Sequence, residues 1–431
     1  MKLLPFVVLT LLVTTGMGVG MAPLSEAPSE SQADAIGFEP SYTVQTDDTA
    51  EADSGVIHTS SIPAEEIDRS DIHRQHVDLG PSAGFDTDAT TERIVTETVR
   101  QDLESTESDT ERVERIDTEL DGIEAEIDDL EAREQSAIRS FSANQIAPRE
   151  LVAELARIHL TADVLRDRVA LLDTQAPDVD SEAVSNRRFE RIEYDLRMFE
   201  GPVRAYTVDV LRGEQPSDRI MIEASDDAVT LAALDDGQYI REVNRRGLRG
   251  EESNEFLNDT EVENKQDRAV ELSQQQYPRL WGLSSSWSSD GPGSVVMVSV
   301  TLDQGALQTF TDGPTEQTFI EHQRLSLDAV VTGETETKFQ DGLNVTVGQT
   351  YAGGPLRLTV TDEETGEPLE TTVTVGQNGQ ESTTVGTTNT DGTLWMVSPR
   401  QPFTITVFGE DNSAAFVDIT PPAPKTVPTT E

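Results

Sequence analysis

Apolar residues recur at alternating spacings of three and four over the first half of the chain. This rhythm predicts amphipathic helices with a 3.5-residue seam, as in a coiled coil. One seam runs over residues 109–142, and a second follows a short break at 144–147 and runs over 148–172. Two seams joined by so few residues predict an antiparallel helical hairpin, in which each helix buries the stripe of the other. The seam positions are Val113, Ile116, Leu120, Ile123, Ile127, Leu130, Ala137, Phe141, Leu151, Leu155, Ile158, Ala162, Leu165, Val169 and Leu172.

Specific residues mark the ends of these helices. Ser108 begins a Ser-x-x-Glu capping box, which is typical of a helix start. Pro148 fits the first position of the second helix, where its missing N–H costs nothing. A third amphipathic segment follows, and we expect Gly201 and Pro202 to bend it or to restart it. We therefore predict a helical bundle over residues 89–213.

Charges beside the seams are consistent with this packing. The first helix carries acidic residues, and the two that follow carry arginines. Opposite charges beside a seam select partner and orientation more than they add stability. An anion site is the alternative interpretation of the arginines, and we favour the structural one. The acidic residues are Asp117, Glu119, Glu124, Glu126 and Glu131, and the arginines are Arg157, Arg166, Arg168, Arg187, Arg188, Arg191 and Arg197.

From residue 219 the apolar period changes to two, which predicts β-strands. A hairpin turning at Asp226 and Asp227 opens this segment. Helices are expected at 261–277 and at 304–310, and strands at 295–302 and 318–327. Trp281 and Trp287 fall in a Ser- and Gly-rich stretch that we assign to a loop, where they close a core edge or stack on a sugar. Together these elements predict a small α+β domain over residues 218–332.

The C-terminal region predicts only β-structure. Its short runs are rich in Thr and Val and are separated by turn residues, so we expect a β-sandwich over residues 343–420. Residues 421–431 are rich in Pro and Thr, and we expect a disordered tail. The expected strands are 343–350, 356–361, 371–375, 383–387, 394–397, 403–408 and 414–419.

The N-terminal region predicts export. Residues 1–22 combine Lys2, an apolar run and a small-residue end, as in a secretory signal. An uncleaved membrane anchor is the alternative, and Pro5 and the glycines favour cleavage. Residues 23–88 are expected to form a flexible linker with a short strand at 56–62.

The amino-acid composition indicates the kind of solution in which the protein works. The 431 residues hold 81 Asp and Glu against 32 Lys and Arg, so the formal net charge is −49, and only four of the basic residues are lysines. Acidic residues are spread over every segment instead of being confined to a tail. Such a surface stays hydrated when salt screens its self-repulsion, which indicates adaptation to very high salt. The charge also argues against nucleic acid as a partner.

Motifs for chemistry are scarce. The sequence has no cysteine and five histidines, and it has no Gly-x-Ser-x-Gly or His-Glu-x-x-His motif. His73 and His76 are three apart, but no third ligand is identifiable and we expect them to be solvated in a loop. Carboxylate pairs are numerous and none stands out; Asp235, Asp236 and the turn at 362–364 lack the calcium-loop pattern. We therefore predict no catalytic residue, no metal site and no cofactor.

Two sets of residues are candidate binding or modification sites. Arg241, Arg245, Arg246 and Arg249 cluster within nine residues, and arginines can grip an anionic glycan or pair with nearby carboxylates. Asn258 and Asn344 begin Asn-x-Thr sequons, which in an exported chain are glycosylation acceptors.

The C-terminal motifs resemble those of a known fold. The stretches 354–356, 366–369, 373–375, 390–395 and 403–407 are similar to the carboxypeptidase-regulatory, transthyretin-like module. This resemblance implies an Ig-like β-sandwich and says almost nothing about function. The whole chain also resembles a family of uncharacterised secreted haloarchaeal surface proteins, most clearly at 352–397 and at 197–213. That resemblance implies no activity and no site residues.

The sequence thus predicts a multidomain protein: a helical bundle with a coiled-coil hairpin, a small α+β domain and an all-β sandwich. We expect a non-enzymatic, exported cell-surface scaffold or interaction protein of a halophile. Envelope proteins or glycans are the expected partners, a homo-oligomer stays open, and membrane contact is expected only through an uncleaved N-terminal segment. The alternatives are an anionic-glycan-binding module and a hydrolase of unknown type in the α+β domain.

Overall fold

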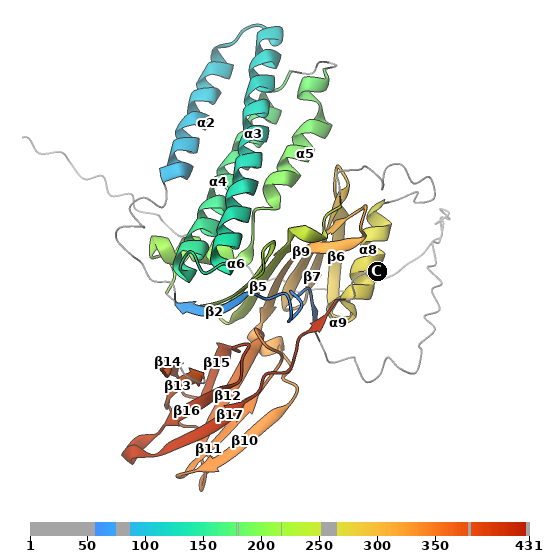
Figure 1. Cartoon of the computed structure of the whole chain (residues 1–431). Helices are drawn as coiled ribbons and strands as arrows, with labels where there is room; N and C mark the ends of the chain where they lie inside the picture. Colours follow the sequence, from blue (N-terminus) through green and yellow to red (C-terminus); the bar gives the residue numbers. More distant parts are fainter. Residues whose placement is uncertain are drawn as a thin grey trace, which may run out of the picture. The chain divides into compact units, whose positions relative to one another are not determined.

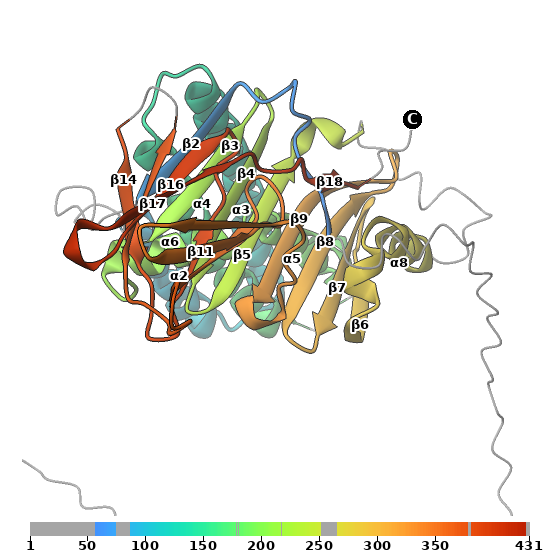
Figure 2. The same ribbon diagram turned by 90° about the horizontal axis from the view of Figure 1, so that it is seen from below.

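The computed structural model describes residues 57–74, 87–177, 179, 181–216, 218–250, 265–377 and 381–427. All of these residues belong to one compact unit, Thr49–Glu431. The expected signal at 1–22 and most of the expected linker lie outside the described residues. Figures 1 and 2 show the arrangement of the elements from two sides.

The helical region matches the seam prediction closely. The predicted helix start at Ser108 is confirmed, because Ser108 Oγ accepts a hydrogen bond from the Glu111 amide at the N-cap of this helix. Pro148 occupies the first turn of the next helix, as predicted. The third amphipathic segment restarts at Gly201 and Pro202, so it forms two helices. The helices are α2 (Thr87–Ser105), α3 (Asp109–Ser142), α4 (Pro148–Gln175), α5 (Asn186–Arg197) and α6 (Pro202–Arg212), with a short 3-10 turn η1 (Glu182–Val184) before α5.

The apolar seam of α3 contributes to two different hydrophobic cores. Its residues between Ile116 and Leu130 pack with α2, α4 and α5. Phe141, near the end of α3, packs instead with α6 and with strand residues such as Ile222 and Leu231. One end of the helical hairpin therefore rests on a β-sheet and shares its core.

Within the described residues that sheet has eight antiparallel strands in the order β2-β3-β4-β5-β9-β8-β7-β6. Alternate residues of each strand face opposite sides. Ile240 faces α3, α4 and α6, whereas Tyr239 faces the core formed with α8 and α9. The strands are β2 (Arg69–Arg74), β3 (Arg219–Ala224), β4 (Ala228–Asp235), β5 (Gln238–Arg245), β6 (Ser284–Asp290), β7 (Val295–Leu302), β8 (Gly305–Asp312) and β9 (Gln317–Ser326); the helices are α8 (Lys265–Gln276) and α9 (Pro278–Trp281).

The C-terminal region is a sandwich of two four-stranded sheets, β10-β11-β12-β15 and β14-β13-β16-β17. All seven predicted strands are present, and Val345, Leu358 and Ile405 are among the residues that fill the space between the sheets. The sequence analysis missed β10, an edge strand on which no residue is fully buried. The strands are β10 (Thr335–Gln340), β11 (Leu343–Gly348), β12 (Pro355–Asp362), β13 (Thr372–Gln377), β14 (Thr383–Thr387), β15 (Thr393–Val397), β16 (Phe403–Phe408) and β17 (Ala414–Ile419).

Two segments near the ends of the described chain are ordered where the sequence indicated linker and tail. Residues 69–74 of the expected linker form β2, which pairs with β3 along its whole length. The short strand β1 (His58–Thr59) lies within the strand predicted at 56–62. It pairs in parallel with β18 (Lys425–Thr426), so part of the expected tail is fixed. The strands β2 and β18 are polar, and they are ordered by backbone hydrogen bonds to strands that are distant in the sequence. The local sequence pattern does not predict such long-range hydrogen bonds.

Two further predictions in the α+β region are wrong. Residues 304–310 were expected to be helical, but they lie in β8 between β7 and β9. The stretch with Trp281 and Trp287 was expected to be a loop, but Trp281 ends helix α9 and Trp287 lies in the edge strand β6. For residues 304–310 and for Trp287, pairing with a neighbouring strand decides the conformation, and the local composition does not contain that information.

Among the described helices, none has the length and apolar composition needed to cross a membrane.

The fold makes a direct prediction about the helical seam. Ile116 is fully buried between α3 and its neighbours, whereas Ile94 on α2 is 63% exposed. Replacing Ile116 by Ala should lower the free energy of unfolding by about 2–5 kcal/mol, because it removes buried methyl groups and leaves a cavity. The matched variant Ile94→Ala should change it by less than about 0.5 kcal/mol. Chemical denaturation in molar KCl measures both, and equal effects would contradict the seam.

Candidate functional site

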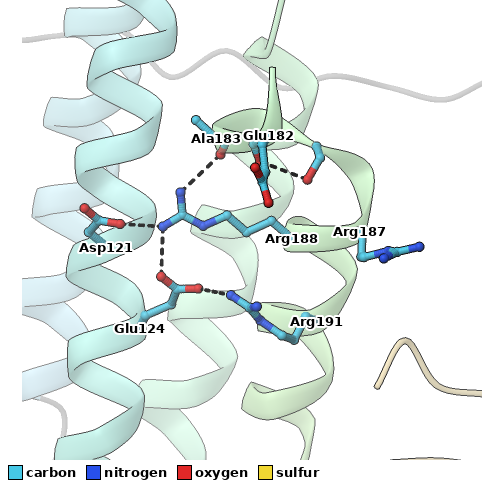
Figure 3. Close-up of a pocket in the computed structure, with 8 residues that line it drawn as sticks. Asp121, Glu124, Glu182, Ala183, Arg187, Arg188 and Arg191 are labelled. Carbon is cyan, nitrogen blue, oxygen red and sulfur yellow. Dashed lines mark hydrogen bonds and ion pairs between the residues drawn. The ribbon is translucent and has the colours of Figure 1, made fainter. Parts of the chain in front are cut away.

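An open pocket of about 350 Å³ lies beside α3, where η1 leads into α5 (Figure 3). Its cationic side chains come from the first turns of α5 and its carboxylates from α3 and η1. It therefore contains part of the arginine set for which the sequence analysis weighed an anion site. The lining residues are Asp121, Glu124, Glu182, Ala183, Ser185, Arg187, Arg188 and Arg191.

Arg188 is held on all sides by the protein itself. Its guanidinium nitrogens lie 2.6 Å from a carboxylate oxygen of Asp117, 2.5 Å from one of Asp121 and 2.8 Å from one of Glu124. It also donates to the Ala183 carbonyl oxygen at 3.1 Å. These are charge-assisted hydrogen bonds, the stronger kind, so this cation is neutralised in place.

The other two arginines differ from Arg188. Arg191 donates to the second oxygen of Glu124, whereas Arg187 is exposed and points away from the carboxylates (Figure 3). Burial by itself would raise the pKa of Glu124, but its hydrogen bonds with Arg188 and Arg191 lower it overall. The pocket thus presents two exposed cations, Arg187 and Arg191, and the second of these is paired with Glu124. This arrangement joins α5 to α3 and offers little to an external anion.

The expectation of opposite charges across the seams is therefore confirmed for Arg188 and Arg191 and is wrong for several others. Arg168, for example, reaches Glu92 on α2 at 2.5 Å, and Arg197 pairs with Glu193 of its own helix. Glu131 on α3 pairs with Arg246, which follows β5. Sequence spacing identifies which face a charge occupies but not which neighbour faces it.

A second cluster of charges lies between α3, α6 and the sheet, and it is fully buried. The Glu134 side chain on α3 has no exposed area, and its carboxylate lies 2.6 Å from a guanidinium nitrogen of Arg204 and 2.8 Å from one of Arg246. Asn244 donates a further hydrogen bond to it at 3.2 Å. Burial alone would raise the pKa of Glu134, but the two guanidinium groups lower it overall.

Glu242 on β5 extends this cluster to the start of α6. One of its oxygens accepts from the Arg204 side chain at 2.8 Å, and the other accepts from the backbone amides of Val203 and Arg204 at 3.0 and 3.2 Å. A carboxylate at this position satisfies free amides at a helix N-terminus. A Cβ on Gly201 would lie 2.0 Å from Glu242 Oε2, so only glycine allows this approach.

The opposite face of the sheet holds a separate buried ion pair. Arg241 on β5 pairs with Glu321 on β9, and both side chains are at most 3% exposed. Glu321 also accepts from the Ser60 amide at 2.5 Å, and Arg241 donates to the Ser60 carbonyl oxygen at 2.6 Å. The N-terminal segment before β2 is thereby fixed to the sheet.

The structure does not bring the four candidate arginines together. Arg241 faces one side of the sheet, and Arg246 contacts Glu131, Glu134 and the ring of Phe199 on the other. The guanidinium of Arg249 lies over the Phe319 ring, 5.3 Å from its centroid. Arg245 is buried, which lowers its pKa against the opposing effect of Glu66 and Asp227. These placements favour structural roles over a shared glycan grip.

Two of the buried carboxylates with a raised pKa, Glu242 and Glu321, do not converge. A third, Glu223, is on the same face of the sheet as Glu321 and is paired with Arg400. Burial raises the pKa of Glu242 against the effect of Arg204, and it raises the pKa of Glu321 against the effect of Arg241. By the register of β5 and β9, these two carboxylates lie on opposite faces of the sheet. They therefore cannot act together on one bond, as a glycosidase pair would.

The candidate histidines and tryptophans of the sequence analysis do not form a common site in the described part of the chain. His73 lies in strand β2 and not in the expected loop, while His76 lies outside the described residues. Within the described part of the chain, no group of three or more His, Cys, Asp or Glu residues could hold a metal ion. Trp281 donates to Ser273 Oγ at 3.0 Å, and the 51% exposed Trp287 lies against it with 6.1 Å between ring centroids.

Of the two sequons, Asn258 lies outside the described residues. Asn344 lies on β11, where its Nδ2 donates to Thr361 Oγ1 at 3.2 Å.

These features define a multidomain protein: a helical region, a mixed region of sheet and helices, and a C-terminal pair of sheets. Residues 334–416 match the model of an archaeal fibronectin-III type-like domain, and residues 220–331 match a family of unknown function (DUF7094). Residues 1–216, half of the chain, match a domain of unknown function (DUF7096). The chain belongs to this DUF7096 family. No curated protein matches it.

The buried cluster predicts a large effect at Glu134 and a small one nearby. Replacing Glu134 by Gln leaves two buried guanidinium groups short of a negative partner, so the free energy of unfolding should fall by about 3–5 kcal/mol. The control Glu131→Gln removes a 37% exposed partner of Arg246 on the same helix and should cost less than about 1 kcal/mol. Urea titration compares them, and similar losses would contradict a central role for Glu134.

His322 predicts a dependence of stability on pH. Burial lowers its pKa to about 3, and Arg204, Arg324 and His159 act in the same direction. The unfolded histidine has a pKa near 6.5, so the unfolded state binds the extra proton as pH falls below that value, and stability is lost. Between pH 7 and pH 5, His322→Gln should lose about 1–2 kcal/mol less stability than the natural chain. Equal losses in urea titrations at the two pH values would refute this assignment.

Proposed function

We propose that this protein is a non-enzymatic, exported cell-surface scaffold or interaction protein of a halophile. The observation that carries the proposal is that buried contacts connect the described domains one to the next. A scaffold needs such contacts, because it must present its surfaces in a fixed arrangement.

The contacts run through the whole described chain. The Glu134 cluster joins α3 and α6 to the sheet. On the other face of the sheet, the Tyr239 hydroxyl donates to the Gly353 carbonyl oxygen at 2.9 Å, and Arg400 pairs with the buried Glu223 at 3.0 Å. These last two contacts connect the sheet to the C-terminal sandwich.

Export and high salt are inferred from the sequence. Residues 1–22 have the pattern of a secretory signal, and the net charge of −49 with only four lysines fits a surface hydrated in brine. The resemblance to secreted haloarchaeal surface proteins agrees with both. The finer likeness of the sandwich to the carboxypeptidase-regulatory fold is part of this proposal, and it concerns fold and not activity.

The proposed partners are other envelope proteins or glycans, met through exposed surfaces and not through the charged pocket beside α5. In that pocket the protein's own carboxylates already bind Arg188 and Arg191. A membrane association is proposed only through the N-terminal segment, if that segment stays attached.

Location is the decisive test. Replacing Leu11 by Arg places a charge within the apolar run of the leader, so the chain should stay inside a halophilic archaeal host instead of reaching the envelope or medium. The control Ala27→Arg adds the same charge after that run and should leave export unchanged. Fractionation with an antibody against the C-terminal sandwich measures both. Retention of the natural chain in the cytoplasm would refute the proposal.

A further inference from the structure

One face of the C-terminal sandwich carries no charge over two neighbouring rows of side chains. In the sheet β10-β11-β12-β15, the strand register places these residues side by side on the face opposite the sandwich core. The first row is Thr337, Thr346, Thr359 and Thr393, and the second is Phe339, Asn344 and Thr361.

The outer face of the other sheet of the sandwich is also uncharged over two rows of paired residues, but of these two faces only the one on β10-β11-β12-β15 carries a sequon. Asp and Glu make up 81 of the 431 residues, and none of them lies in the two rows on β10-β11-β12-β15. Phe339 is 59% exposed at the edge of this face. The exposed ring of Phe339 is therefore available to pack against a group attached next to it.

Asn344 lies in the middle of the second row and begins the Asn-x-Thr sequon, with Thr346 as its hydroxyl residue. Phe339 is its direct cross-strand partner on β10. Side chains directly opposite in an antiparallel pair have Cβ atoms about 4.5–5.5 Å apart. On its other side, Asn344 Nδ2 donates to Thr361 Oγ1 at 3.2 Å.

We propose that Asn344 carries an N-linked glycan and that the first sugar packs on the ring of Phe339. The inference rests on the proposed export, because glycan transfer to a sequon takes place on chains that leave the cytoplasm.

The chemistry requires a glycan donor, which we take to be a lipid-phosphate-linked oligosaccharide of the host membrane. Asn344 Nδ2 forms a C–N bond to the anomeric carbon of the first sugar. The bond from that carbon to the lipid phosphate breaks, and the phosphate leaves with the bonding electrons. The amide nitrogen loses one proton, which in the net balance goes to the leaving phosphate. The second amide proton remains and can still donate to Thr361, so the observed hydrogen bond is compatible with the modified residue.

The neighbours of Asn344 suit a sugar. The C–H face of a pyranose is apolar and packs on an aromatic ring, and Phe339 is the exposed ring that the register places opposite the acceptor. The threonine hydroxyls of the next row can bond to sugar hydroxyls. A glycan here would hydrate a face that lacks carboxylates.

Trypsin makes the modification directly measurable. Cleavage after Lys338 and Arg357 releases residues 339–357, which contain Asn344 as their sequon. In full-length protein secreted by a halophilic archaeal host, mass spectrometry should find this peptide heavier by whole sugar units. Asn344→Gln and the near-isosteric Thr346→Val should both abolish the added mass.

The role of Phe339 is tested separately by thermal unfolding in molar salt. Loss of the glycan in Asn344→Gln should lower the unfolding midpoint by about 2–4 °C. In a Phe339→Ala background this difference should largely disappear. In the control background Phe416→Ala it should persist, because Phe416 is 51% exposed but lies opposite Thr406 and not opposite a sequon.

The outcomes separate this inference from the proposed function. An exported chain whose 339–357 peptide is unmodified refutes the glycan and leaves export standing. A chain retained in the cytoplasm refutes the proposed function and the glycan together. A modified chain refutes the packing if Asn344→Gln lowers its unfolding midpoint equally with and without Phe339. An unmodified chain that self-associates through this face also refutes the inference.

Discussion

The carboxylate of Glu134 is the interaction on which the described architecture depends most. It has no exposed area, and it contacts guanidinium groups from α6 and from the end of β5. A buried charge is tolerated only with excellent partners, because removing it from water costs several kcal/mol. The cluster therefore specifies one arrangement of helices and sheet more than it adds net stability.

The same principle explains how an acidic chain uses its few cations. Arg204, Arg241 and Arg188 each sit among carboxylates of other elements and are largely shielded from solvent. Arginine suits this task because its planar group bonds several oxygens at once and stays charged. Salt screens exposed pairs far more than buried ones, so these links keep their strength in brine. Some of the cations are thus placed at buried junctions between elements.

The proposed function and the proposed glycan fit this division of the surface. Where carboxylates are dense, the chain hydrates itself. Where the fibronectin-like sandwich has an uncharged face around Asn344 and Phe339, a sugar can take over that role. Both ideas treat the molecule as a set of fixed surfaces, which agrees with buried contacts such as the one from Tyr239 to Gly353.

The amino-acid sequence by itself determined the regular elements with strong periodicity. The helices at 109–142 and 148–175, the restart at Gly201 and the seven predicted strands of the sandwich follow from spacing, caps and turns, which are local properties. The sequence also predicted that arginines beside a helical seam pair with carboxylates, and the structure confirms this for Arg188 and Arg191.

Only the tertiary structure decided the rest. Strand β2 forms by pairing with β3, which is distant in the sequence, so its local composition indicated a linker. Strand β8 forms by pairing with β7 and β9, although its local composition indicated a helix. The four arginines at 241–249 looked like one patch because they are close in sequence. A strand sends alternate side chains to opposite faces, so the fold separates them into different buried contacts. The sequence did not predict a role for Glu134, because it is one of many carboxylates on an acidic helix. Only the packing of α6 and the sheet against α3 makes it a buried partner of two arginines.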